Sequence, residues 1–102
     1  MKPHDAKVLI VEDEVIVSLD IQTILKDMGI AVTGIAHSVD QALTSIAGER
    51  PDLVLLDISL DGEFEGVELA RTIDRRWGIP VVFIDREPSN PRFSAIRPCD
   101  EH

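Results

Sequence analysis

Three short runs of consecutive apolar residues constrain this chain most, because a strand with no polar position must be buried on both faces. The runs are Val8 to Val11, Leu53 to Leu56 and Val81 to Ile84. A half-buried strand alternates apolar and polar residues, whereas a strand of a parallel sheet covered on both faces does not. These runs therefore predict the central strands of a parallel sheet. A weaker run, Ala31 to Ala36, predicts a fourth strand nearer its edge.

Between these runs the apolar residues recur with the 3.6-residue period of an α-helix. Helices are predicted over Glu14 to Met28, Ser38 to Ala47 and Gly66 to Trp77, followed by Gly29, Gly48 and Gly78. Ser38 and Gln41 have the spacing of a capping box at the start of the second helix. The residues expected to face the sheet are Val17, Ile21, Ile24, Leu25 and Met28; Val39, Ala42, Leu43, Ile46 and Ala47; and Val67, Ala70, Ile73 and Trp77.

Strands and helices thus alternate along the chain, which predicts an α/β fold with right-handed crossovers and helices on both faces of the sheet. The length of 102 residues allows one domain, residues 1–102, with its core in residues 7–84. Residues 85–102 are expected to be irregular, because Pro88 and Pro91 oppose a helix. Within that segment, residues 93–96 are the candidate for a short fifth strand.

The net charge of −9 argues against functions that need a basic surface. Nucleic acids and anionic membranes are bound by clustered lysine and arginine, so neither is expected as a partner. The longest apolar runs have about four residues, far fewer than the roughly 20 that span a bilayer, and residues 1–6 lack a signal-peptide pattern. Cys99 is the only cysteine, so no internal disulfide is expected. A cytoplasmic location fits these features.

Acidic residues follow three of the four predicted strands. Glu12 and Asp13 come directly after the first run, Asp57 after the third and Asp85 after the last. Ligands of parallel sheets bind beyond the carboxyl ends of the strands, so these acids are expected in one crevice. Two carboxylates 5 Å apart repel by roughly 3 kcal/mol at an effective dielectric of about 20, so the cluster requires a cation or raised pKa values. Mg²⁺ prefers such oxygen ligands; alternatively, each acid is only a cap or a solvated loop charge.

The residues around these acids resemble the receiver domain of response regulators. The matching segments are VLIVEDE (8–14), PDLVLLDI (51–58), DG (61–62), GVE (66–68) and IPVVF (79–83). The resemblance implies a flavodoxin-like, doubly wound parallel sheet, with strand order 2-1-3-4-5 if a fifth strand forms. It also implies that Asp57 accepts a phosphoryl group from a histidine kinase or a histidine phosphotransfer protein. Such a protein is not an enzyme, apart from catalysing its own phosphorylation and dephosphorylation.

The same resemblance implies a Mg²⁺ site. Asp13, Asp57 and the backbone carbonyl of Ser59 would bind the ion directly, and Glu12 would act through water. The ion would offset the negative charge that builds up when a phosphoryl group meets a carboxylate.

Two positions and the length depart from the receiver pattern. Asp85 stands where receivers have a Thr or Ser hydroxyl, and an ionised carboxylate there would repel a phosphoryl group. Arg97, before Pro98, stands in the place of a lysine, and its planar guanidinium is not equivalent to an ammonium. Only 18 residues follow Ile84, whereas a helix, a strand and a second helix need about 28–30. Regular fourth and fifth helices are therefore not expected.

These departures leave alternatives open. The chain would otherwise be a pseudo-receiver, a protein-interaction module that oligomerises and is not regulated by phosphorylation, or a receiver with an altered tail that has lost its switch. Phosphatases with an aspartyl nucleophile have a second acid two residues after that aspartate. This chain has Ser59 at that position, which argues against a phosphatase. Without the last helices, apolar surface on the first helix and beside the fourth strand predicts a homodimer or higher oligomer.

The histidines His4, His37 and His102 lack the spacing of metal ligands and are interpreted as surface residues. Cys99 is interpreted as an incidental exposed thiol, because no resolving cysteine accompanies it.

Overall fold

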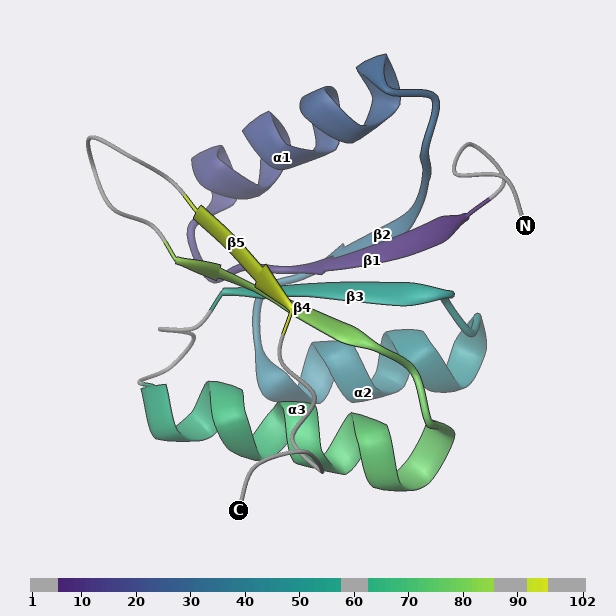
Figure 1. The fold of residues 1–102 in the computed structure, drawn as a ribbon, viewed down its shortest axis with the longest axis vertical. Helices are drawn as coiled ribbons and strands as arrows, with labels where there is room; N and C mark the ends of the chain where they lie inside the picture. Colours follow the sequence, from purple (N-terminus) through teal and green to yellow (C-terminus); the bar gives the residue numbers. More distant parts are fainter. Residues whose placement is uncertain (1–5, 58–62, 86–91, 96–102) are drawn as a thin grey trace.

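The computed structural model describes residues 6–57, 63–85 and 92–95, which form one sheet with helices on both faces (Figure 1). The strands are β1 (Lys7–Val11), β2 (Ala31–Ala36), β3 (Leu53–Asp57), β4 (Val81–Asp85) and β5 (Arg92–Ala95). The helices are α1 (Val15–Asp27), α2 (Val39–Gly48) and α3 (Glu63–Trp77). No helix in the described ranges has both the length and the apolar character needed to cross a membrane.

The strands lie in the order β2-β1-β3-β4-β5, which confirms the predicted flavodoxin-like order. The first four are parallel, and the weakly apolar β2 lies at the edge as expected. The parallel arrangement does not extend to β5, which pairs antiparallel to β4. Only residues 86–91 separate these two strands, and a parallel crossover needs a dozen or more residues. The short connection therefore decides the direction of β5.

Two clusters of buried side chains form the core, one on each face of the sheet. Figure 1 shows α1 alone on one face and α2 with α3 on the other. The cluster beneath α2 and α3 contains Leu9, Val11, Ala36, Ala42, Ile46, Val54, Leu56, Leu69, Ala70, Ile73, Ile79, Val81 and Phe83. The cluster beneath α1 contains Val8, Ile10, Ile21, Leu25, Leu55 and Ile84. The apolar runs of the central strands thus contribute to both clusters, as their continuous hydrophobicity predicted.

The buried face of α1 is narrower than its sequence predicted. Ile21 and Leu25 are buried, but Ile24 and Met28, expected on the same face, are 53% and 62% exposed. Because α1 is the only helix of the described residues on its side of the sheet, only the stripe directly above β1 and β2 is enclosed. The prediction for Ile24 and Met28 was therefore wrong.

The end of α1 follows its sequence signal, whereas the start of α3 does not. Gly29 adopts a φ of +80° after α1, and the N–H groups of Gly29 and Ile30 donate to the carbonyls of Lys26 and Leu25. This pattern is a Schellman motif, which favours glycine because the left-handed conformation crowds a Cβ atom. α3 begins at Glu63 rather than Gly66, because Phe64 is the single apolar residue of the first turn and one such residue establishes no helical period.

Candidate functional site

The carboxyl ends of β1 and β3 bring together three of the acids predicted to converge. Val11 is paired with Leu56, so the next residues, Glu12 and Asp57, are also neighbours. The carboxylate oxygens of Glu12, Asp13 and Asp57 all lie within 4.8 Å of one another. We refer to these three residues as the acidic cluster.

The acidic cluster is mostly enclosed. Glu12 and Asp57 are 0% exposed, whereas Asp13 is exposed and marks where the cluster meets solvent. Two ionised carboxylates 4–5 Å apart repel by roughly 3–4 kcal/mol at an effective dielectric of about 20. The arrangement therefore favours a positively charged ligand.

The donors of the acidic cluster fit a hard divalent cation. Opposite oxygens around Mg²⁺ are about 4.2 Å apart, twice its metal–oxygen distance of about 2.1 Å. The upper limit of 4.8 Å within the cluster is close to that span. All three donors are carboxylate oxygens, and Mg²⁺ commonly combines one or two such ligands with several waters.

The end of β2 holds Glu12 in place. The Glu12 N–H donates to the Ala36 carbonyl at 2.9 Å, and Nδ1 of His37 lies 2.9 Å from the Glu12 carbonyl oxygen. Glu12 Oε1 accepts a hydrogen bond from the Glu14 N–H at 3.1 Å. His37, interpreted from the sequence as a surface residue, is half-buried and bonded to the backbone of Glu12. Its position directly after a strand, like that of the acids, is the sequence signal that could have singled it out.

The capping box predicted at the start of α2 is present beside His37. Ser38 Oγ accepts a hydrogen bond from the Gln41 N–H at 3.2 Å. The side chain of Gln41 in turn accepts one from the His37 N–H at 2.8 Å, one residue before the cap.

The remaining predicted site residues are placed only in part. Asp57 pairs with Ile84 in the register of β3 and β4, so the backbone of Asp85 lies one residue further along β4, at its end. Ser59 and Arg97 lie outside the described residues. The predictions for His4, His102 and Cys99 also fall outside them.

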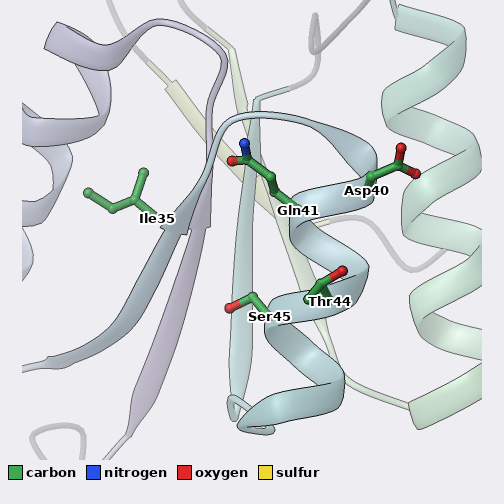
Figure 2. A pocket seen from close by; sticks show the side chains of 5 residues that line it. All are labelled: Ile35, Asp40, Gln41, Thr44 and Ser45. Carbon is green, nitrogen blue, oxygen red and sulfur yellow. The ribbon is translucent and has the colours of Figure 1, made fainter.

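A groove of about 390 Å³ lies apart from the acidic cluster. Its lining residues are Ile35, Asp40, Gln41, Thr44 and Ser45. Figure 2 shows Ile35 on β2 and the other four side chains on α2. The groove shares no residue with the acidic cluster, and its only ionisable side chain is Asp40. We therefore assign it no chemistry.

Comparison with known proteins identifies the family. The sequence pattern of the response regulator receiver domain matches residues 8–95. The chain is similar to the phyllosphere-induced regulator PhyR of Methylorubrum extorquens, with 32% identity over 84 residues, covering 80% of this chain and 31% of PhyR. It is also similar to the nitrogen assimilation regulatory protein NtrX of Azorhizobium caulinodans, with 42% identity over 83 residues, covering 79% of this chain and 18% of NtrX.

A solved structure supports the same assignment. PhyR complexed with the anti-sigma factor NepR, from Bartonella quintana, matches with a TM-score of 0.77 and 29% identity, covering 89% of this chain and 41% of that chain. The chain spans less than a third of PhyR from Methylorubrum extorquens and of NtrX. Receiver domains are signalling modules rather than enzymes. The sheet order, the acidic cluster and the match over most of the sequence agree that this chain belongs to the response regulator receiver domain family of two-component signalling.

Proposed function

We propose that this chain is a phosphoacceptor of a two-component phosphorelay and that Asp57 receives the phosphoryl group. The supporting observation is the position of Asp57 at the end of the central strand β3, within 4.8 Å of the other carboxylates of the acidic cluster. The donor is the phosphohistidine of a histidine kinase or a histidine phosphotransfer protein. A carboxylate oxygen of Asp57 bonds to phosphorus, the phosphorus–nitrogen bond breaks, and the released imidazole takes a proton from solvent.

Mg²⁺ belongs to this proposed site. Asp13 and Asp57 would hold it with the Ser59 carbonyl, and Glu12 would act through water. When bound, it supplies positive charge against the phosphoryl oxygens. The protein itself holds Asp57 on a buried strand, and a side chain on a rigid element is positioned better than one on a loop.

The proposal extends to the arrangement of the whole chain. Residues 1–102 form one cytoplasmic domain with its core in residues 7–84. Asp85 takes the place of a phosphate-binding hydroxyl, and Arg97 takes the place of the receiver lysine. The described elements from β1 to β4 support the proposed core.

A second candidate function is that of a pseudo-receiver, which binds a protein partner without being phosphorylated. It is favoured by Asp85, which ends the strand next to Asp57 and would place negative charge close to a phosphoryl group. The similar PhyR from Bartonella quintana is described in complex with an anti-sigma factor, which supports protein binding as a function of this fold.

Self-association through α1 is part of both candidates. The exposed large apolar residues of this helix and of the residue that caps its end are Val15, Ile16, Leu19, Ile24 and Met28, at 49–76% exposure. We call them the α1 apolar surface. Large exposed apolar patches are typical of protein–protein contacts, so we propose that a second copy of the chain covers this surface in a homodimer or higher oligomer.

A phosphorylation assay separates the two candidate functions. The chain is incubated with acetyl phosphate and Mg²⁺, and the product is analysed by intact-mass and peptide mass spectrometry. The receiver function predicts a single phosphoryl adduct on Asp57 that is absent from Asp57→Asn and requires Mg²⁺. Failure to form an adduct, under conditions that phosphorylate another receiver domain, would contradict it and favour the pseudo-receiver.

A further inference from the structure

We propose that His37 is a positioning residue for the acidic cluster. Its ring holds the peptide group between Glu12 and Asp13 and thereby directs both carboxylates. The inference rests on the proposed function of the cluster as a cation site. It assigns a role to the residue directly after β2.

The hydrogen bond between His37 and Glu12 defines the state of the ring. Nδ1 lies 2.9 Å from the carbonyl oxygen of Glu12, which lies 25 residues earlier in the sequence. A carbonyl oxygen can only accept, so Nδ1 must carry the hydrogen, and Nε2 of the neutral ring carries none. The bond connects the carboxyl end of β2 to the carboxyl end of β1.

Two consecutive residues therefore hold both backbone polar groups of Glu12. Its N–H donates to Ala36 and its carbonyl accepts from His37, each at 2.9 Å. Because a peptide group is planar, fixing the Glu12 carbonyl also fixes the N–H of Asp13 and restricts where the Asp13 side chain begins. Loss of the His37 bond would remove one restraint on the orientation of the peptide group after Glu12.

His37 is itself anchored, so it can act as a rigid support. Its N–H donates to Gln41 Oε1 at 2.8 Å, and the Gln41 N–H donates to Ser38 Oγ at 3.2 Å. These bonds tie the residue to the first turn of α2, and its side chain is half-buried. A flexible side chain would hold the acidic cluster far less firmly, because fixing that side chain would cost more conformational entropy.

Mn²⁺ affinity, measured by electron paramagnetic resonance of the full chain, tests the inference. His37→Ala removes the donor. His37→Asn keeps an amide N–H near the position of Nδ1, whereas His37→Gln moves it toward that of Nε2. We expect Ala and Gln to weaken Mn²⁺ binding about three- to tenfold, as for the loss of one positioning hydrogen bond, and Asn to remain within about twofold of wild type.

Ile46→Val is the matched control. It removes a methylene group from the buried side of α2 without touching Glu12, His37 or the hydrogen bonds that anchor His37, so it should lower thermal stability and leave Mn²⁺ affinity unchanged. A weakened affinity in Ile46→Val equal to that of His37→Ala would overturn the positioning role, because general destabilisation would then explain both. Equal affinities of wild type and His37→Ala, or an Asn variant as weak as Ala, would overturn it as well.

A metal-independent measurement distinguishes failure of this inference from failure of the proposed function. Long-range ¹H–¹⁵N spectra of wild type at pH 8 are expected to show the ring proton on Nδ1, and His37→Ala is expected to speed amide exchange at Asp13. A proton on Nε2, or unchanged Asp13 exchange, would refute the role of His37. Absence of Mn²⁺ binding in wild type would refute the metal site instead, and the spectra would then decide the inference.

Discussion

At the scale of the residue, Asp57 and Glu12 occupy positions that a fold selected for stability alone would avoid. Both are 0% exposed, and with Asp13 their carboxylate oxygens lie within 4.8 Å of one another. Burying ionised carboxylates together costs several kcal/mol unless another charge compensates. The acidic cluster therefore reduces the stability of the metal-free protein and provides an affinity for cations in return.

This cost predicts that Mg²⁺ stabilises wild type more than Asp57→Asn. Without metal, Asp57→Asn should be more stable by about 1–2 kcal/mol, because one repelling charge is gone. At ten times its dissociation constant, Mg²⁺ should stabilise wild type by about 1.4 kcal/mol and the variant much less. Thermal unfolding with EDTA and with Mg²⁺ measures both effects. A variant stabilised by Mg²⁺ as strongly as wild type would contradict the role of Asp57 in the site.

Asp85 supplies a second prediction at this scale. Its backbone lies one residue beyond the partner of Asp57 in β4, and the pseudo-receiver proposal assigns it repulsion of a phosphorylated Asp57. Asp85→Thr should increase the yield or lifetime of the phosphoryl adduct, and about 1.4 kcal/mol of relieved repulsion corresponds to about tenfold. Mass spectrometry over time measures the adduct. Asp85→Asn removes the charge without adding a hydroxyl, and unchanged adducts in both variants would disprove the repulsion.

At the scale of the element, the ends of the helices position the residues of the site. The capping box of α2 lies next to His37. α1 begins at Val15, two residues after Asp13 of the acidic cluster. The other end of α1 is closed by Gly29 at a φ of +80°. The start of α2 and the end of α1 were readable from local sequence, because their capping residues lie within one turn of the chain.

The two glycines after α1 and at the end of α2 should respond oppositely to the same substitution. Gly29→Ala places a Cβ on a left-handed residue and should cost about 1–2 kcal/mol. At Gly48 a Cβ would meet nothing within 4 Å, so Gly48→Ala should stabilise α2 by about 0.5–1 kcal/mol. Urea denaturation measures the free energy of unfolding of each variant. Changes of the same sign would show that backbone conformation is not the cause.

At the scale of the whole molecule, the two faces of the sheet are covered unequally. Among the described elements, α2 and α3 cover one face and α1 is the single helix on the other (Figure 1). The α1 apolar surface follows from this difference, with Ile16 exposed at 76%. The segment after β4 explains why β5 is antiparallel. Only six residues separate the two strands, which is too few for a crossover helix.

The unequal coverage predicts self-association that depends on α1. Wild type should show a mass above that of the monomer in light scattering, increasing with concentration, because association buries the α1 apolar surface. Ile16→Glu should shift the chain to monomer, since a charge in an apolar contact is costly. Thr44→Glu adds the same charge to α2 and should leave the mass unchanged. A monomer mass for wild type at every concentration would exclude the oligomer.

Local sequence by itself determined the element types, the edge position of β2 and the acids at the strand ends, because periodicity and caps act over a few residues. The parallel sheet then brought Glu12, Asp13 and Asp57 together as predicted. Only the tertiary structure decided the exposure of Ile24 and Met28 and the bond from His37 to Glu12. Each of these depends on what lies across space from a residue, which neither its neighbours in sequence nor its helical period specifies.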